Sequence, residues 1–196
     1  MGRPDTEGNR RSVRETTGMT SRRNTRLAAA GAWMMAWSAL AGAAMYQRDY
    51  CFVPHVLAVN AGQQVEFLNN DVANHGVSAA SFEAENRFNV TTPPGGSYKH
   101  RFAASKRPVA IGCPIHAAMS AWIYVFDHPY HTVTDETGSF RLPPVPPGRY
   151  TLRVRHPDGG MDRRQEIVVR PAAPVRLRIE FGEKDLKAGT RANPTR

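Results

Sequence analysis

The 196-residue chain has only two cysteines, Cys51 and Cys113, which are too few for a scaffold held together by disulfides. It also lacks an amphipathic helical pattern of useful length after residue 45. Its 15 prolines and 16 glycines instead favour short strands joined by many turns. No Ser/His/Asp set, pair of carboxylates or phosphate-binding loop is visible, so the sequence does not predict an enzyme.

Basic residues are scarce in the middle of the chain, although the whole chain has a net charge of +9. Residues 45–140 have 6 basic and 8 acidic side chains, whereas residues 1–44 have 7 and 3, and residues 141–196 have 13 and 6. Near the C-terminus the arginines alternate with apolar residues and do not cluster with exposed aromatic residues. We therefore expect no binding to nucleic acid.

Residues 1–44 have the pattern of a targeting segment. The basic stretch TSRRNTR precedes an apolar run over residues 27–44, which contains the small residues Ala39, Ala41 and Ala43. This pattern predicts a signal peptide and an exported protein of the periplasm or cell envelope, with Met19 as an alternative start to Met1. If residues 27–44 are not cleaved, they are long enough to anchor the protein in a membrane, at about 27 Å for 1.5 Å per residue.

Alternation of apolar and polar residues predicts strands in the rest of the chain. The strand-like segments are HVLAV and QQVEFLN, joined by a turn at residues 60–62, and then SYKHRF, RPVAIGC and AWIYVF. A further strand is predicted at 175–181, and Leu152 and Val154 alternate with arginines in the same way. We interpret these arginines as a solvent-exposed strand face. The predicted fold class is all-β.

Strand alternation also indicates which side chains enter the core. Cys51 and Phe52 are adjacent, so their side chains face opposite sides of a strand, and we expect Phe52 in the core. In AWIYVF the sequence does not choose between an aromatic and an aliphatic inward face, namely Trp122 with Tyr124 or Ile123 with Val125.

The segment GCPIHAAMS at 112–120 places Cys113, His116 and Met119 at intervals of three residues. A thiolate, an imidazole and a thioether are an incomplete metal site, because a blue-type copper site has two histidines and one cysteine in a plane, with a weak axial methionine. His75, in NNDVANHGV, follows the VEFLN strand and is the candidate for the second imidazole. A β-sandwich can bring that strand end beside the Cys113 loop.

The stretch FVPHVLAVNAGQQVEFLNNDVANHGV, followed downstream by GCPIHAAM, resembles the cupredoxin family, which includes plastocyanin, azurin and amicyanin. YQRDYCFVPHV and the run from CPIHAAM to YVFDHPYHTVTDETG are similar to exported bacterial cupredoxin-like proteins of the methylamine-utilisation type. The resemblance implies a Greek-key β-sandwich over 45–126 and one copper ion, Cu(I) or Cu(II), held by His75, Cys113, His116 and Met119. It further implies a monomer that carries single electrons to and from a transient redox protein partner.

The sequence departs from the cupredoxin pattern at two places. In that family an asparagine usually follows the upstream histidine and ties its loop to the cysteine loop, whereas here Gly76 follows His75 and Asn74 precedes it. We therefore expect a looser site or an altered reduction potential. Ala117 and Ala118 stand where relatives often have bulkier residues, which would leave His116 more open to water.

Residues 127–182 resemble a second β module. VTDETGSF and PPGRYTLRV are similar to segments of the carboxypeptidase-regulatory-like or transthyretin-like β-sandwich. Because only its later strands are visible, we expect a partial β-sandwich module that extends the cupredoxin sheet. Residues 183–196 are predicted to be a disordered tail.

Alternatives to an electron carrier remain at this point. Cys51 and Cys113 could form a disulfide in an exported protein, which would leave a metal-free binding or structural module of the cell envelope. The same ligands could also serve storage or delivery of Cu(I) in the periplasm. Met119 alone would be more typical of core packing. His128 and His131, with Asp127, could hold a second metal ion, although such a pair in a loop is more typical of unliganded surface.

Overall fold

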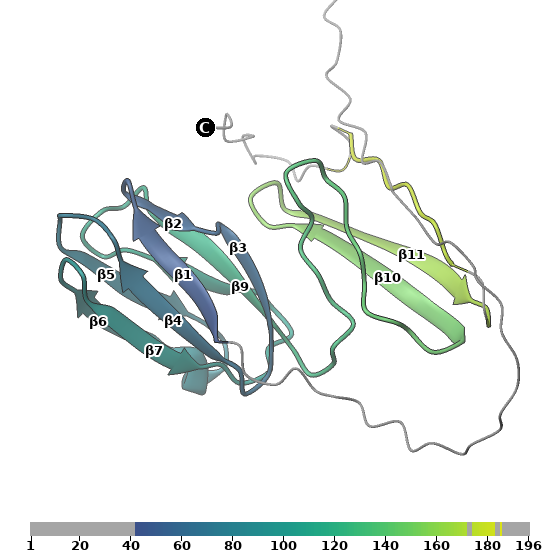
Figure 1. Cartoon of the computed structure of the whole chain (residues 1–196), viewed down its shortest axis with the longest axis horizontal. Coiled ribbons are helices and arrows are strands. Elements are labelled where there is room, and N and C mark those ends of the chain that lie inside the picture. Colours follow the sequence, from purple (N-terminus) through teal and green to yellow (C-terminus); the bar gives the residue numbers. More distant parts are fainter. Residues whose placement is uncertain (1–41, 172–173, 183–184, 186–196) are drawn as a thin grey trace, which may run out of the picture. The chain divides into compact units, whose positions relative to one another are not determined.

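The computed structural model describes residues 42–171, 174–182 and 185 (Figure 1). Within them the protein is all-β, as predicted, and the three-residue 3-10 turn Ala84–Asn86 is the only helical element that lies wholly in the described part of the chain. Of the predicted targeting segment 1–44, residues 1–41 lie outside the described residues. Of the predicted tail 183–196, only Asp185 is among the described residues. No helix among the described residues is long and apolar enough to cross a membrane. The chain divides into two compact units between Val133 and Thr134.

One sheet of the first unit contains four strands in the order β2-β1-β4-β7. Their bounds are β1 (Ala43–Arg48), β2 (Cys51–Val53), β4 (Gln64–Asn69) and β7 (Ser97–Arg101). β1 is parallel to β4, and the other pairs are antiparallel. β1 begins at Ala43, before the boundary predicted at residue 45.

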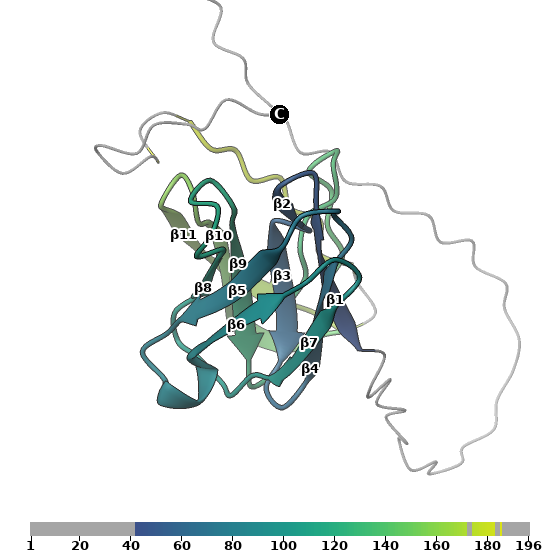
Figure 2. The same ribbon diagram turned by 90° about the vertical axis from the view of Figure 1, so that its left-hand side faces the viewer.

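The second sheet contains five strands in the order β3-β9-β8-β5-β6. Their bounds are β3 (Val56–Asn60), β5 (His75–Ala80), β6 (Phe88–Thr92), β8 (Val109–Gly112) and β9 (Ser120–Phe126). β3 is parallel to β9 and the remaining pairs are antiparallel. The chain changes sheet after β2, β3, β4, β6 and β7, so its connections cross repeatedly between the two layers of a β-sandwich (Figure 2).

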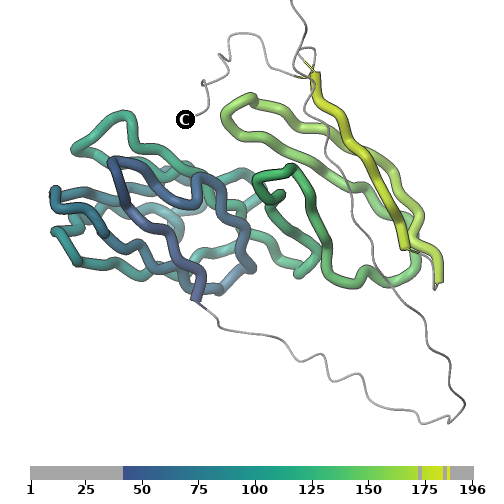
Figure 3. Tube along the Cα trace, turned by 45° about the horizontal axis from the view of Figure 1, so that its top comes forward, coloured from purple at the N-terminus to yellow at the C-terminus, as the bar shows by residue number. Residues whose placement is uncertain are grey.

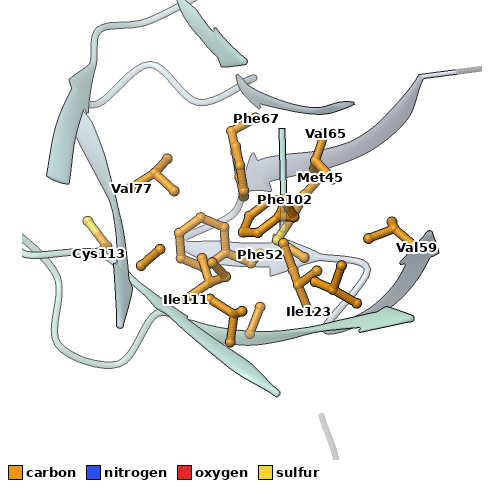
Figure 4. Close-up of a cluster of buried hydrophobic side chains, with 14 of the residues drawn as sticks. Met45, Phe52, Val59, Val65, Phe67, Val77, Phe102, Ile111, Cys113 and Ile123 are labelled. Atoms are coloured by element: carbon orange, nitrogen blue, oxygen red, sulfur yellow. The ribbon is translucent and has the colours of Figure 1, made fainter. Parts of the chain in front are cut away.

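The hydrophobic core lies between these two sheets. Figure 4 shows Phe67 and Val65 of β4 packed with Val77 of β5 and Ile123 of β9, with Cys113 at the edge of the cluster. Burying one such aromatic or aliphatic side chain contributes about 1.5–3 kcal/mol, so the alternating inward positions of the strands stabilise the sandwich.

The structure shows which side chains of β2 and β9 face the core. Phe52 is buried and Cys51 is half-exposed, as predicted. In β9 the aliphatic side chains Ile123 and Val125 belong to the core cluster, whereas Trp122 is half-buried outside it. Tyr124 is buried as well but lies outside this cluster, so the aliphatic pair forms the face of β9 that packs into the core.

The second unit contains one antiparallel ribbon of β10 (Gly148–His156) and β11 (Met161–Val169). Arg153 of β10 forms an ion pair with Asp162 of β11, and its side chain is exposed, which agrees with the predicted solvated face. This ribbon is the only sheet among the described residues of the unit.

The strand predicted at 175–181 is wrong. Ile179 is buried while Arg178 and Glu180 are exposed, so the side chains do alternate, and the segment runs beside β11 (Figure 3). It has no backbone ladder to β11, however. Pro174 has no N–H to donate, and the Arg163 guanidinium binds the Glu180 carbonyl at 2.7 Å, an oxygen that a ladder would use.

Candidate metal centre

The four predicted ligands lie at one edge of the five-stranded sheet, three of them at strand ends and one in a connecting loop. His75 begins β5, Cys113 directly follows β8, and Met119 directly precedes β9, with His116 in the loop between the latter two. The loop is short because β8 and β9 pair as neighbours up to Gly112 and Ser120. The adjacent strands β5 and β8 therefore bring a distant histidine beside this loop.

Three donor atoms converge at this place. One nitrogen each from His75 and His116 and the sulfur of Cys113 all lie within 4.8 Å of one another. The Nδ1 atoms of the two histidines are 3.0 Å apart, and Nδ1 of His116 is 3.7 Å from Sγ of Cys113. One thiol and two imidazoles are a donor set that suits copper or zinc. The residues present therefore fit a transition-metal ion.

The loop that holds three of the candidates is closed by its own backbone. The N–H of Cys113 donates to the carbonyl of Met119 at 3.2 Å, and the N–H of Met119 donates to the carbonyl of His116 at 3.0 Å. Met119 is 2 % exposed and belongs to the same buried cluster as Cys113. Both sulfur-containing residues are thus buried, whereas His116 is only half-buried.

Cys113 is not joined to Cys51 by a disulfide. Its sulfur instead accepts the backbone N–H of Gly76 at 3.3 Å. This bond connects the histidine loop to the cysteine loop, the connection that an asparagine after the histidine usually makes in cupredoxins. A hydrogen bond to the sulfur stabilises a thiolate and tunes any metal bound to it.

Glycine is needed at position 76 because the neighbouring chain is too close for a side chain. A Cβ atom there would lie 2.8 Å from Cδ of Pro114 and 3.1 Å from the carbonyl oxygen of Val90. The absence of a side chain lets the backbone of β5 approach the cysteine loop closely enough for the N–H to reach sulfur.

Asp71 was not identified from the sequence. Its Oδ2 lies 2.7 Å from Nε2 of His75, and its carboxylate also accepts the backbone N–H groups of Asp49 and Tyr50, at 2.7 and 3.1 Å. Partial desolvation raises the pKa of Asp71, but the hydrogen bonds from Tyr50, His75 and Asp49 outweigh it and hold the pKa below its ordinary value. The signal that could have revealed this residue is an acidic side chain four positions before a candidate ligand.

A network of buried polar side chains stabilises strand β5, which begins with His75. Gln47 donates from Nε2 to the carbonyl of Gly76 at 2.9 Å and accepts the Thr92 hydroxyl at 2.7 Å. Asn69 donates to the carbonyls of Ala73 and Thr92, both at 2.8 Å. Because these side chains are almost fully buried and hydrogen-bonded, they fix β1, β5 and β6 relative to one another.

Tyr50 was also missed by sequence analysis. It lies at the tip of the β1–β2 hairpin, and its ring packs edge-on against both His75 and His116, with ring centroids 5.4 and 4.9 Å apart. The Asp-Tyr pair gave no signal, because two-residue hairpin loops of this kind usually contain Asn-Gly or Asp-Gly.

His128 and His131 do not join a metal-binding group within the described residues. His131 stacks on Phe126 at 4.6 Å, and its Nε2 lies 3.0 Å from Oδ1 of Asn60. His128 is exposed. The contacts of these two histidines within the described residues therefore give no support to a second metal site.

One protein-family model matches part of the chain. Residues 119–182 match the carboxypeptidase regulatory-like domain model. This match agrees with the resemblance seen in VTDETGSF and PPGRYTLRV, and it begins at Met119, so it includes β9 as well as β10 and β11. It covers less than half of the chain. No curated protein gives a significant match.

Several solved structures are similar to part of this chain at low identity. A copper-containing nitrite reductase from Thermus scotoductus SA-01 is 23 % identical with a TM-score of 0.40, over 43 % of this chain and 22 % of that chain. A Cu(I) mutant of amicyanin is 15 % identical with a TM-score of 0.40, over 46 % of this chain and 88 % of that chain. A reduced Cu(I) form of a second amicyanin mutant is 16 % identical, with the same coverage and TM-score.

Proposed function

We propose that this chain is an exported mononuclear type 1 copper protein that carries single electrons between redox proteins. The observation that supports the proposal best is the convergence of His75, Cys113 and His116 donor atoms within 4.8 Å. Two of the three residues are buried, so the donors are held together by the fold and not by chance at a mobile surface.

Each residue has a distinct role in this proposal. The Cys113 thiolate and the imidazoles of His75 and His116 would hold the metal, and the Met119 thioether would be a weaker fourth ligand. When bound, copper would supply a one-electron Cu(I)/Cu(II) couple. His75 is held by Asp71, and the Cys113 loop is held by its own backbone, so the donors need little rearrangement when the charge of the centre changes.

His116 is the proposed route for the electron. It is half-buried, whereas the other three candidates are buried. A reduced partner protein gives one electron at this edge and an oxidised partner later removes it, and no bond is made or broken. The partner would bind transiently over a small interface, as befits an electron carrier that acts as a monomer and is not an enzyme.

The test is a titration of the purified chain with Cu(II), followed by a reductant, with visible spectroscopy. We expect an intense thiolate-to-copper band that bleaches on reduction. Cys113→Ser should abolish the band, whereas the matched control Cys51→Ser should retain it. A colourless protein that binds one Cu(I) tightly would contradict electron transfer and favour storage or delivery, and a protein that binds no copper would favour a metal-free β-sandwich module.

A further inference from the structure

The tip of the β1–β2 hairpin has an unusual backbone for its sequence. Arg48 pairs with Cys51, so Asp49 and Tyr50 alone form the loop. Their φ angles are +52° and +58°, and a type I′ turn requires φ > 0 at both positions. Aspartate tolerates this left-handed conformation, but a bulky side chain such as that of Tyr50 rarely adopts it. Glycine would make the same turn more easily, so the turn itself does not explain the tyrosine.

The side chain of Tyr50 is placed against the candidate metal centre. Its ring is edge-on to the imidazoles of both His75 and His116, with interplanar angles of 86° and 84°. The two imidazoles are themselves in contact, with ring centroids 4.8 Å apart. One aromatic ring therefore contacts both candidate imidazole ligands while its own outer part remains exposed to solvent.

A single carboxylate fixes the hairpin tip and the buried histidine together. Asp71 accepts the N–H groups of Asp49 and Tyr50 and also binds Nε2 of His75. The position of the Tyr50 backbone is thereby tied to the position of the His75 ring. This gives the hairpin a defined place above the centre without any covalent link.

We propose that Tyr50 is a positioning residue of the metal centre. Its ring holds the His116 imidazole against His75 and restricts the access of water and small anions to the donors. This inference rests on the proposed copper function. It explains why a tyrosine occupies a left-handed turn position, because the cost in backbone conformation is offset by contacts that glycine could not make.

The test uses three variants of the purified chain. Tyr50→Gly removes the ring and suits the positive φ, whereas Tyr50→Phe retains the ring. Tyr46→Ala is the matched control, because Tyr46 is an exposed tyrosine of the same hairpin with no ring contact to either histidine in the described part of the chain. Three quantities are measured: the urea midpoint, the rate at which diethyl pyrocarbonate modifies His116 in metal-free protein, read by peptide mass spectrometry, and azide affinity of Cu(II)-loaded protein.

We expect Tyr50→Gly to fold at least as stably as the wild type, because glycine adopts positive φ freely. His116 should nevertheless be modified several-fold faster, and azide should bind several-fold more tightly, because the ring no longer covers the donors. Tyr50→Phe and Tyr46→Ala should match the wild type in both reactivity measurements.

Two outcomes would overturn the proposal. Unchanged His116 reactivity and azide affinity in Tyr50→Gly would show that the ring positions nothing. An equal increase in Tyr46→Ala would show a general loosening of the hairpin. If the wild type binds no copper, the proposed function fails, and the metal-free His116 rates still decide whether Tyr50 covers and holds that imidazole.

Discussion

Nε2 of His75 donates a hydrogen bond to Oδ2 of Asp71 across 2.7 Å in the buried part of the first unit. A carboxylate can only accept, so Nε2 is the nitrogen that carries the proton in this bond, and Nδ1 is the nitrogen left to offer a lone pair. That atom faces His116 at 3.0 Å and belongs to the group formed with Cys113. Asp71 thus sets the tautomer that a metal ligand needs.

Replacing Asp71 with asparagine should weaken copper binding. A carboxylate has two oxygens that accept hydrogen bonds, whereas the amide of asparagine has one accepting oxygen and one donating NH2 group. The proton of His75 is therefore less firmly held on Nε2, and the orientation of the ring is less well defined. We expect copper affinity to fall about tenfold, measured by competition with a chelator. Asp49→Asn is the matched control, because it removes the same charge from a neighbouring residue whose backbone, and not its carboxylate, contacts Asp71. An equal loss in both variants would indicate a general electrostatic effect instead.

Gly76→Ala should distort the connection between the two ligand loops. The new methyl group would clash with Pro114 at 2.8 Å and with the Val90 carbonyl at 3.1 Å, which would move the N–H away from the sulfur of Cys113. We expect a loss of about 1–3 kcal/mol in the free energy of unfolding, measured by urea titration. Gly112→Ala should be tolerated, because its nearest neighbouring atom would be Oγ of Ser78 at 3.6 Å. A fully stable Gly76→Ala protein would contradict the close approach.

Gln47→Leu should destabilise the protein although leucine is apolar. The change would leave the Thr92 hydroxyl and the Gly76 carbonyl buried without their partner, and each such group costs about 1–3 kcal/mol. Adding Thr92→Val removes one of these groups, so the double variant should recover part of the loss. Strictly additive losses in the urea-unfolding cycle would show that the two side chains do not interact.

Stability should fall on mild acidification because of His100. Its half-buried ring packs against Phe88 and Phe102, with centroids 4.5 and 4.7 Å away, and desolvation lowers its pKa despite an opposing interaction with the Glu85 backbone. Above about pH 6.5, the ordinary histidine pKa, the imidazole is neutral in both the folded and the unfolded state. As the pH falls through that value towards the lower folded pKa, the unfolded chain binds the proton first, and stability is lost.

His100→Phe checks this prediction because it keeps an aromatic ring and removes the titration. The urea midpoint of the wild type should fall relative to that of the variant between pH 7 and pH 5. Parallel pH profiles would show that His100 does not contribute. His131, whose pKa desolvation also lowers, remains in both proteins and so affects both profiles equally.

Much of the sandwich could be predicted because its signals are local. The turn at residues 60–62 and the strands on either side follow from alternation and turn chemistry, and both appear as predicted. Alternation failed at 175–181 for a physical reason. It reports which side chains face the same way, but a strand also needs free backbone donors and acceptors on a neighbouring chain, and Pro174 and Arg163 interfere with these.

The all-β fold class and the position of Cys113, His116 and Met119 in one short loop follow from the amino-acid order alone, because strand periodicity and ligand spacing are properties of a few consecutive residues. The meeting of His75 with this loop, and the contacts of Asp71 and Tyr50 with the imidazoles, become visible in the three-dimensional arrangement alone. These relationships depend on which strands pair and how two sheets pack. Such non-local hydrogen bonds and burial are not encoded in any single segment of the chain.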